Sequence, residues 1–107
     1  MILKELSKRQ QRLIKALKES KIARVKNQCF IVEGLKSVEE VIGSDFEIRF
    51  IVLSDIFLSS NNVLLKKLWD KIPKDHLYRV SDKTFAELAD TVTPQGILAV
   101  ANFSEIG

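Results

Sequence analysis

Four short, almost continuous apolar runs punctuate the chain, and segments with helical spacing of apolar residues separate them. The runs cover residues 29–32, 46–53, 76–80 and 97–103, and the helical patterns cover residues 7–20, 35–42, 63–72 and a short segment from residue 82. Strands that are apolar on both faces need cover on both sides, and alternation with helices is typical of parallel sheets. The pattern predicts a three-layer α/β/α sandwich with about four strands, largely parallel, and its one long loop at the polar residues 59–62.

Length and composition fit one small cytoplasmic domain. The chain has 107 residues, of which 46% are hydrophobic and 29% charged, which is enough for a core without disulfides. The single cysteine, Cys29, has no partner for a disulfide, as expected in a reducing compartment. The sequence contains no membrane-length apolar stretch and no signal-peptide pattern, so we expect a cytoplasmic location.

Positive charge is concentrated at the N-terminus. Residues 1–27 carry nine cations and two anions, a net charge of +7, whereas residues 28–107 carry eight cations and twelve anions, a net charge of −4. Such asymmetry indicates a polyanionic partner, and phosphate contacts from Lys and Arg dominate the affinity of proteins for nucleic acid. We favour nucleic acid as this partner, and an anionic membrane surface is the alternative. The candidate residues for binding nucleic acid are Lys8, Arg12, Lys15, Lys18, Lys21, Arg24 and Lys26.

The first of these cations lie on a predicted amphipathic helix. Its apolar residues form one stripe at 100° per residue, the lysines and Arg12 lie opposite, and Ser7 with Gln10 matches a capping box. We expect the helix to begin near Ser7 and to end near Ser20, and residues 21–26 to form a basic loop. The alternative is an ordinary surface helix with a solvated charged side.

The sequence contains no recognisable catalytic motif. Cys29 lies in an apolar run and is expected to be a buried strand thiol, and nothing local links it to the only histidine, His76. Trp69 has the spacing of a core residue, although a base-stacking role is the alternative. The four glycines are too scattered for a phosphate loop. We therefore predict no catalytic, cofactor-binding or metal-binding residues in this chain.

Two sequence blocks, in order and about sixty residues apart, resemble the SpoU (TrmH-type) RNA ribose methyltransferases. The first runs from Ile14-Lys15-Ala16-Leu17 through Lys21 and Arg24 to Phe30-Ile31-Val32-Glu33-Gly34, and the second is Thr91-Val92-Thr93-Pro94-Gln95-Gly96. The chain departs from the family pattern at Gln11, where Asn is usual, and at Gln28-Cys29, where Gly is frequent.

The resemblance implies that residues 1–107 form a single N-terminal substrate-binding domain, with a fold similar to ribosomal proteins that bind kinked RNA. It implies that the partner is structured RNA, with rRNA favoured. No membrane partner is expected, because the sequence has no apolar stretch of membrane length. The family's 2′-O-methyl transfer belongs to a separate C-terminal knotted domain, which binds S-adenosylmethionine and whose motifs have no match in this chain. That catalytic domain of the same parent protein is the second expected partner.

Other functions are compatible with the residues alone. One is a stand-alone RNA-binding protein of the ribosomal kink-turn type, which shares the expected fold and charge. Another is a protein–protein docking module, or a membrane-surface module, that uses the first helix. A self-contained enzyme is the function that the sequence favours least.

Overall fold

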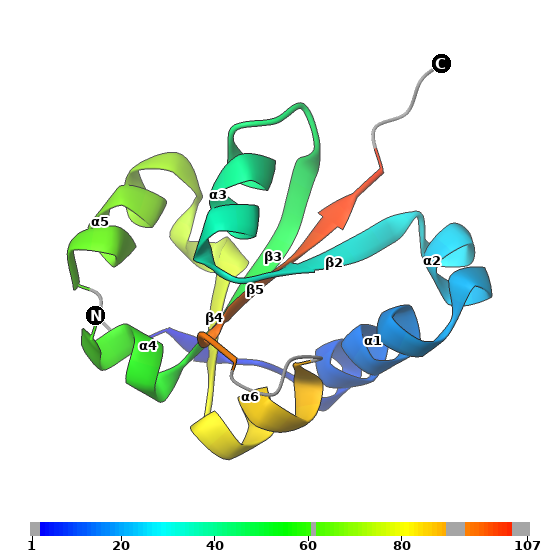
Figure 1. The fold of residues 1–107 in the computed structure, drawn as a ribbon, viewed down its shortest axis with the longest axis horizontal. Helices are drawn as coiled ribbons and strands as arrows, with labels where there is room; N and C mark the ends of the chain where they lie inside the picture. The colour runs from blue at the N-terminus through cyan, green and yellow to red at the C-terminus, as the bar shows by residue number, and fades with distance from the viewer. Residues whose placement is uncertain (1–2, 61, 90–93, 104–107) are drawn as a thin grey trace.

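A computed structural model of the chain describes residues 3–60, 62–89 and 94–103. Its centre is a five-stranded sheet in the order β1-β4-β3-β5-β2 (Figure 1). The strands are β1 (Lys4–Glu5), β2 (Cys29–Glu33), β3 (Glu47–Ser54), β4 (Leu77–Val80) and β5 (Ile97–Asn102). The pairs β1–β4 and β3–β4 are parallel, and β5 runs antiparallel to both of its neighbours, β3 and β2.

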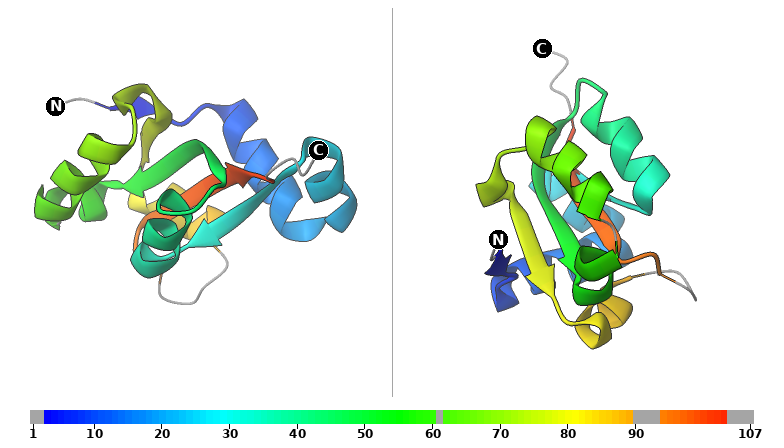
Figure 2. Two further views of the ribbon diagram at one scale, coloured as in Figure 1. Left: turned by 90° about the horizontal axis from the view of Figure 1, so that it is seen from above. Right: turned by 90° about the vertical axis from the view of Figure 1, so that its left-hand side faces the viewer.

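Helices cover both faces of this sheet (Figures 1 and 2). They are α1 (Lys8–Glu19), α2 (Lys21–Asn27), α3 (Leu35–Ile42), α4 (Asp55–Ser60), α5 (Asn62–Lys71) and α6 (Asp82–Leu88), with a short 3-10 helix η1 (Lys74–His76). One apolar cluster joins the sheet to α1 and α6, and a second joins it to α3, α4 and α5. The predicted α/β/α architecture is therefore confirmed.

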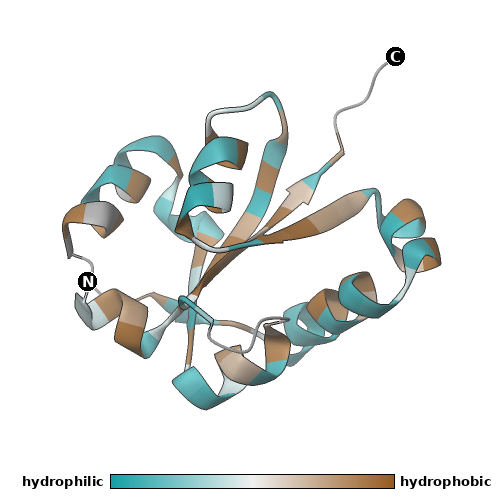
Figure 3. Ribbon diagram, in the orientation of Figure 1, coloured by the Kyte–Doolittle hydropathy of each residue, from teal (hydrophilic) through white to brown (hydrophobic). Residues whose placement is uncertain are grey.

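The two central strands explain the continuous apolar runs of the sequence. Successive side chains of a strand point to opposite faces, so Phe50 and Val52 enter the α1/α6 cluster while Ile51 and Leu53 enter the other cluster. All four side chains are buried. Figure 3 shows apolar residues along the middle of the sheet and a mixture of polar and apolar residues on the helices.

The sheet differs from the prediction in strand number and direction. The additional strand β1 has two charged, exposed residues and lies at the edge beside β4. Its flanking residues Leu3 and Leu6 are buried in opposite clusters and hold the strand in place. The antiparallel direction of β5 was not predicted, because a continuous apolar run is compatible with both parallel and antiparallel pairing.

Two segments predicted as loops are helical. Ser20 ends α1 and also caps α2, where its hydroxyl accepts a hydrogen bond from Ala23 N (3.1 Å). Helix α2 ends at Asn27, and the capping residue that follows it, Gln28, adopts a left-handed conformation (φ 54°, ψ 41°). Helix α4 continues to Ser60 and so extends into the predicted polar loop. No described helix is long and apolar enough to cross a membrane.

Candidate nucleic-acid interface

Helix α1 is anchored by its cap and by its apolar stripe. The predicted capping box is present: Ser7 Oγ accepts a hydrogen bond from Gln10 N (3.1 Å), and Gln10 Oε1 accepts one from Ser7 N (2.9 Å). Ile14 and Leu17 are fully buried against the sheet. Because the apolar stripe faces inward, Lys8, Arg12 and Lys15 project from the opposite side and are exposed.

Helix α2 continues this positive surface. It follows α1 directly (Figure 1). Lys21 and Lys26 are exposed on it. We call the exposed set the basic face: Lys8, Arg12, Lys15, Lys21 and Lys26. Within the described ranges, none of these five side chains forms an ion pair. Their charge is therefore available to an external anion.

Two of the predicted RNA-binding cations have internal partners. Lys18 is half-buried and its Nζ donates a hydrogen bond to Ala89 O (3.1 Å), which links α1 to the end of α6. Arg24 donates from Nη1 to Leu17 O (2.6 Å), a carbonyl in the last turn of α1. A cation beside the last carbonyls of a helix satisfies acceptors that lack a partner in the helix. Both residues therefore contribute to packing.

Arg49, which was not among the predicted site residues, lies on the adjoining polar surface. Its Nε donates to Asn102 Oδ1 (2.9 Å) and its Nη2 donates to Asn27 O (3.1 Å), so it links β3, β5 and the end of α2. It lines two shallow hollows of about 540 Å³ each, one of which extends along α1 to Arg9 and Tyr78. The only available signal was a lone cation inside an apolar strand.

The end of the first block of the family resemblance, Glu33-Gly34, meets the second block at the end of the sheet away from α2. Gly34 N donates to Ile97 O (3.0 Å), and Gln95 Oε1 accepts a hydrogen bond from Leu35 N at the start of α3 (2.8 Å). Gly96 has a φ of 95°, and its carbonyl accepts from Ser54 N (2.9 Å). These contacts give the blocks a structural role. Thr91, Val92 and Thr93 lie outside the described residues, and so does the side chain of Trp69.

The titratable groups with perturbed pKa values have structural explanations. Cys29 is fully buried, and burial raises the pKa of its thiol despite the opposing influence of Arg49. Cys29 is therefore a buried strand thiol, as predicted. Asp55 accepts two hydrogen bonds from Arg79, at 2.8 and 2.7 Å, and this pairing lowers the pKa of the Asp55 carboxyl. Among the described residues, no cluster of His, Cys, Asp or Glu could hold a metal ion.

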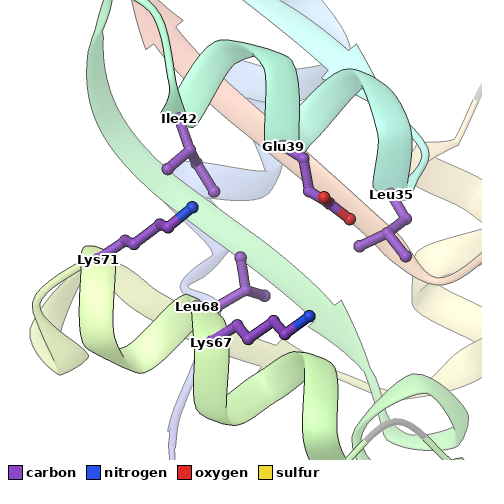
Figure 4. A pocket seen from close by; sticks show the side chains of 6 residues that line it. All are labelled: Leu35, Glu39, Ile42, Lys67, Leu68 and Lys71. Carbon is purple, nitrogen blue, oxygen red and sulfur yellow. The ribbon is translucent and has the colours of Figure 1, made fainter.

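A third hollow lies between α3 and α5 (Figure 4). Leu35, Glu39 and Ile42 of α3 line one side of it, and Lys67, Leu68 and Lys71 of α5 line the other. Its volume of about 40 Å³ is far below the several hundred Å³ of a typical ligand site. We therefore regard it as a helix–helix contact.

Solved structures share this fold over nearly the whole chain. A protein from Porphyromonas gingivalis assigned to the TrmH family of RNA methyltransferases is 24% identical, with a TM-score of 0.67 over 91% of this chain and 35% of its own. The AdoMet-bound rRNA methyltransferase of Sinorhizobium meliloti is 19% identical, with a TM-score of 0.66 over 95% of this chain and 36% of its own. An RNA 2′-O ribose methyltransferase is 18% identical, with a TM-score of 0.73 over 100% of this chain and 39% of its own.

These likenesses establish the fold, and the chain spans between 35% and 39% of the length of those three proteins. No curated protein matches the sequence. Together with a family match over most of the chain, the fold defines a substrate-binding domain of the SpoU/TrmH-like RNA methyltransferase type. Residues 8–99 match the MRM3-like substrate binding domain, and the chain belongs to this family. The resemblance seen in the sequence is thereby confirmed.

Proposed function

We propose that this chain is the RNA-recognition domain of an rRNA 2′-O-ribose methyltransferase that acts in the cytoplasm. In this proposal, residues 1–107 hold structured RNA and a separate catalytic domain of the same protein methylates one ribose. Membership of a substrate-binding family supports an RNA partner. The S. meliloti neighbour, whose name specifies rRNA and AdoMet, supports the choice of rRNA and of the cofactor.

The observation that carries the proposal is the basic face. Its five cations are exposed on consecutive helices and have no carboxylate partner in the described part of the chain. Each cation that neutralises a phosphate releases condensed counterions, so such a surface binds RNA with a strong salt dependence. Contacts of this kind position RNA, and specificity then comes from RNA shape and unpaired bases.

We propose that S-adenosylmethionine does not bind to the described residues of this chain. The two larger hollows are open and lined mostly by charged and amide side chains, and the third is too small. The space beside the backbone of Gly34 and of Gly96 is filled by side chains of this chain: Gln95 lies against Gly34, and Ser54 and Phe57 lie against Gly96. We therefore assign the cofactor to the separate catalytic domain and expect titration calorimetry of S-adenosylmethionine into this chain to show no saturable binding. Saturable micromolar binding would contradict this assignment.

The test is fluorescence anisotropy with labelled, structured rRNA fragments at two or more salt concentrations. A variant with Arg12, Lys15, Lys21 and Lys26 changed to Ala removes four cations and leaves the packing contacts of Lys18 and Arg24 intact. We expect wild-type binding to weaken steeply with salt. In the variant, the slope of log K against log salt should fall by about 0.7 to 0.9 for each phosphate that the protein no longer neutralises.

A matched control removes the same charge from the other face of the sheet. Lys36, Lys66, Lys67 and Lys71 are exposed on α3 and α5, and their replacement by Ala should leave RNA affinity nearly unchanged. Equally weakened binding in both variants would show that only net charge matters. Undiminished binding by the basic-face variant would rule out the basic face as the RNA surface.

A further inference from the structure

Three phenylalanines form an aromatic cluster on the surface at one end of the sheet. The ring of Phe30 lies edge-on to Phe46, with centroids 5.1 Å apart, and stacks on Phe103, with centroids 5.3 Å apart. Phe46 remains 37% exposed and Phe103 remains 45% exposed. Phe30 therefore covers part of Phe103, and the remaining exposed part of Phe103 is accessible to a further group.

This cluster adjoins the basic face. Phe103 N donates a hydrogen bond to Gln28 O (2.9 Å), so Phe103 sits beside the end of α2. Figure 1 shows α2 and the C-terminal end of β5 at the same end of the molecule. A strand of RNA whose phosphates contact Lys21 and Lys26 would therefore pass close to the open ring.

A polar hollow of about 540 Å³ lies next to Phe103 and has the groups that recognise base edges. Its lining includes the planar side chains of Asn27, Gln28, Arg49 and Asn102. The hydrogen bonds from Arg49 to Asn102 Oδ1 and Asn27 O hold this lining in place before any ligand arrives. Amide and guanidinium groups are the side chains that pair with the donors and acceptors of exposed bases.

Gln28 is an unusual residue for the left-handed position at the end of α2. Left-handed residues at helix ends are usually glycine, because a side chain is strained there. Gln28 is the only non-glycine residue with positive φ in the described part of the chain. Its side-chain amide is exposed and makes no hydrogen bond within those ranges, so it remains free to bind a ligand.

Charge in the hollow distinguishes a base from a phosphate. The carboxylates of Asp45 and Glu47 also line it. They would repel a phosphate, but they accept hydrogen bonds from the amino and imino groups of a base. A nucleotide could place its base in the hollow, against these carboxylates, and its phosphates on the neighbouring basic face, against the cations.

We propose that Phe103 and the adjoining hollow bind one unpaired RNA base, stacked on the open ring with its edge facing Gln28. This site deepens the proposed function and rests on the basic face binding the RNA backbone. Stacking of a base on an aromatic side chain contributes about 1–3 kcal/mol by alanine substitution, which corresponds to roughly 5- to 150-fold in affinity.

The test compares a short RNA hairpin carrying one bulged adenosine with the fully paired hairpin. Phe103→Ala should weaken binding of the bulged RNA by about tenfold or more and leave the paired RNA unaffected, whereas Phe103→Tyr should retain affinity. Ile56→Ala, which truncates an exposed apolar side chain on α4, is the matched control and should bind both RNAs like the wild type.

An abasic bulge tests the site without altering the protein. An abasic bulge keeps the phosphate charge, so the wild type should bind it as weakly as Phe103→Ala binds the intact bulge. Binding of the abasic bulge to Phe103→Ala should be no weaker than with either change alone. Equal wild-type affinity for intact and abasic bulges would overturn the base site while leaving the basic face intact, and the cluster would then fit a protein partner. Weaker binding of both RNAs to the same extent in Phe103→Ala would overturn it too. A wild type that binds neither RNA would contradict the underlying function instead.

Discussion

The guanidinium Nη1 of Arg24 lies 2.6 Å from the carbonyl oxygen of Leu17, so a side chain of α2 closes the C-terminal end of α1. The same nitrogen lies 3.5 Å from the carbonyl of Lys18. The two basic helices are therefore fixed relative to each other by a residue that belongs to the positive segment. A rigid pair of helices presents its cations at fixed positions, which suits recognition of a structured RNA rather than of an arbitrary polyanion.

Replacing Arg24 by Ala should destabilise the protein more than replacing an exposed cation of the same helix. The change leaves half-buried carbonyls at the end of α1 without their charged donor, and such hydrogen bonds contribute about 1.5–3 kcal/mol. Lys21→Ala removes an equal charge from an exposed position and should cost less than about 0.5 kcal/mol. Urea denaturation of both variants measures the difference, and equal midpoints would contradict the capping role.

The roles of Arg24 and Lys18 show what the sequence could not reveal about the site. Their cationic character and grouping were visible, and five of the seven predicted residues are exposed as a positive surface requires. The partners were not visible, because Ala89 is 71 residues from Lys18 and meets it only through the packing of α1 on α6. Charge pattern alone does not distinguish a cation that caps a helix from one that faces solvent.

The fold, too, was predictable from the sequence in some elements and not in others. The runs that became β3 and β5 were recognisable because both faces are buried, which leaves no polar alternation. Helix α2 was missed because Ser20 ends one helix and caps the next, so one polar residue looked like the start of a loop. The aromatic cluster was missed because Phe30, Phe46 and Phe103 come from distant segments that only the sheet brings together.

Gly96 should tolerate no side chain. Its φ of 95° strains any other residue, and a Cβ there would overlap Ser54 Oγ and approach Phe57 Cβ at 3.0 Å. Ser54 is itself buried and accepts a hydrogen bond from Phe57 N (3.2 Å), so it has little freedom to move. We expect Gly96→Ala to cost more than about 2 kcal/mol.

Gly43 provides the comparison for that change. It has a φ of −81°, and a Cβ there would meet no atom closer than 3.6 Å. Gly43→Ala should therefore be close to neutral in the same thermal or urea denaturation. Similar destabilisation of the two variants would mean that the backbone conformation at Gly96 is not the cause.

Cys29 should react with a thiol reagent only when the protein opens. Its side chain is fully buried in the sheet, and burial raises the pKa of the thiol, so both access and thiolate content are low in the native state. Colorimetric thiol titration should give slow labelling in buffer and one rapidly reacting thiol in denaturant. Rapid stoichiometric labelling under native conditions would show that β2 is open at the sheet edge.

The ion pair between Asp55 and Arg79 predicts a pH dependence of stability with a defined sign. Hydrogen bonding to Arg79 lowers the pKa of the Asp55 carboxyl below its ordinary value of 3.8, so the unfolded chain binds the proton more readily than the folded one. The contribution is therefore complete above the ordinary pKa and is lost as the pH falls through the lower pKa of the folded state. At neutral pH, Asp55→Asn should cost no more than about 1 kcal/mol, because the pair is partly solvated. The stabilities of wild type and Asp55→Asn should converge as the pH falls below 3.8.

Asp70→Asn is the control, because Asp70 is exposed and forms no ion pair in the described part of the chain. Its stability should stay near that of the wild type at neutral pH. Urea denaturation at a series of pH values measures both variants, and a difference between wild type and Asp55→Asn that persists unchanged to the lowest pH would show that the carboxylate charge is not what stabilises this pair.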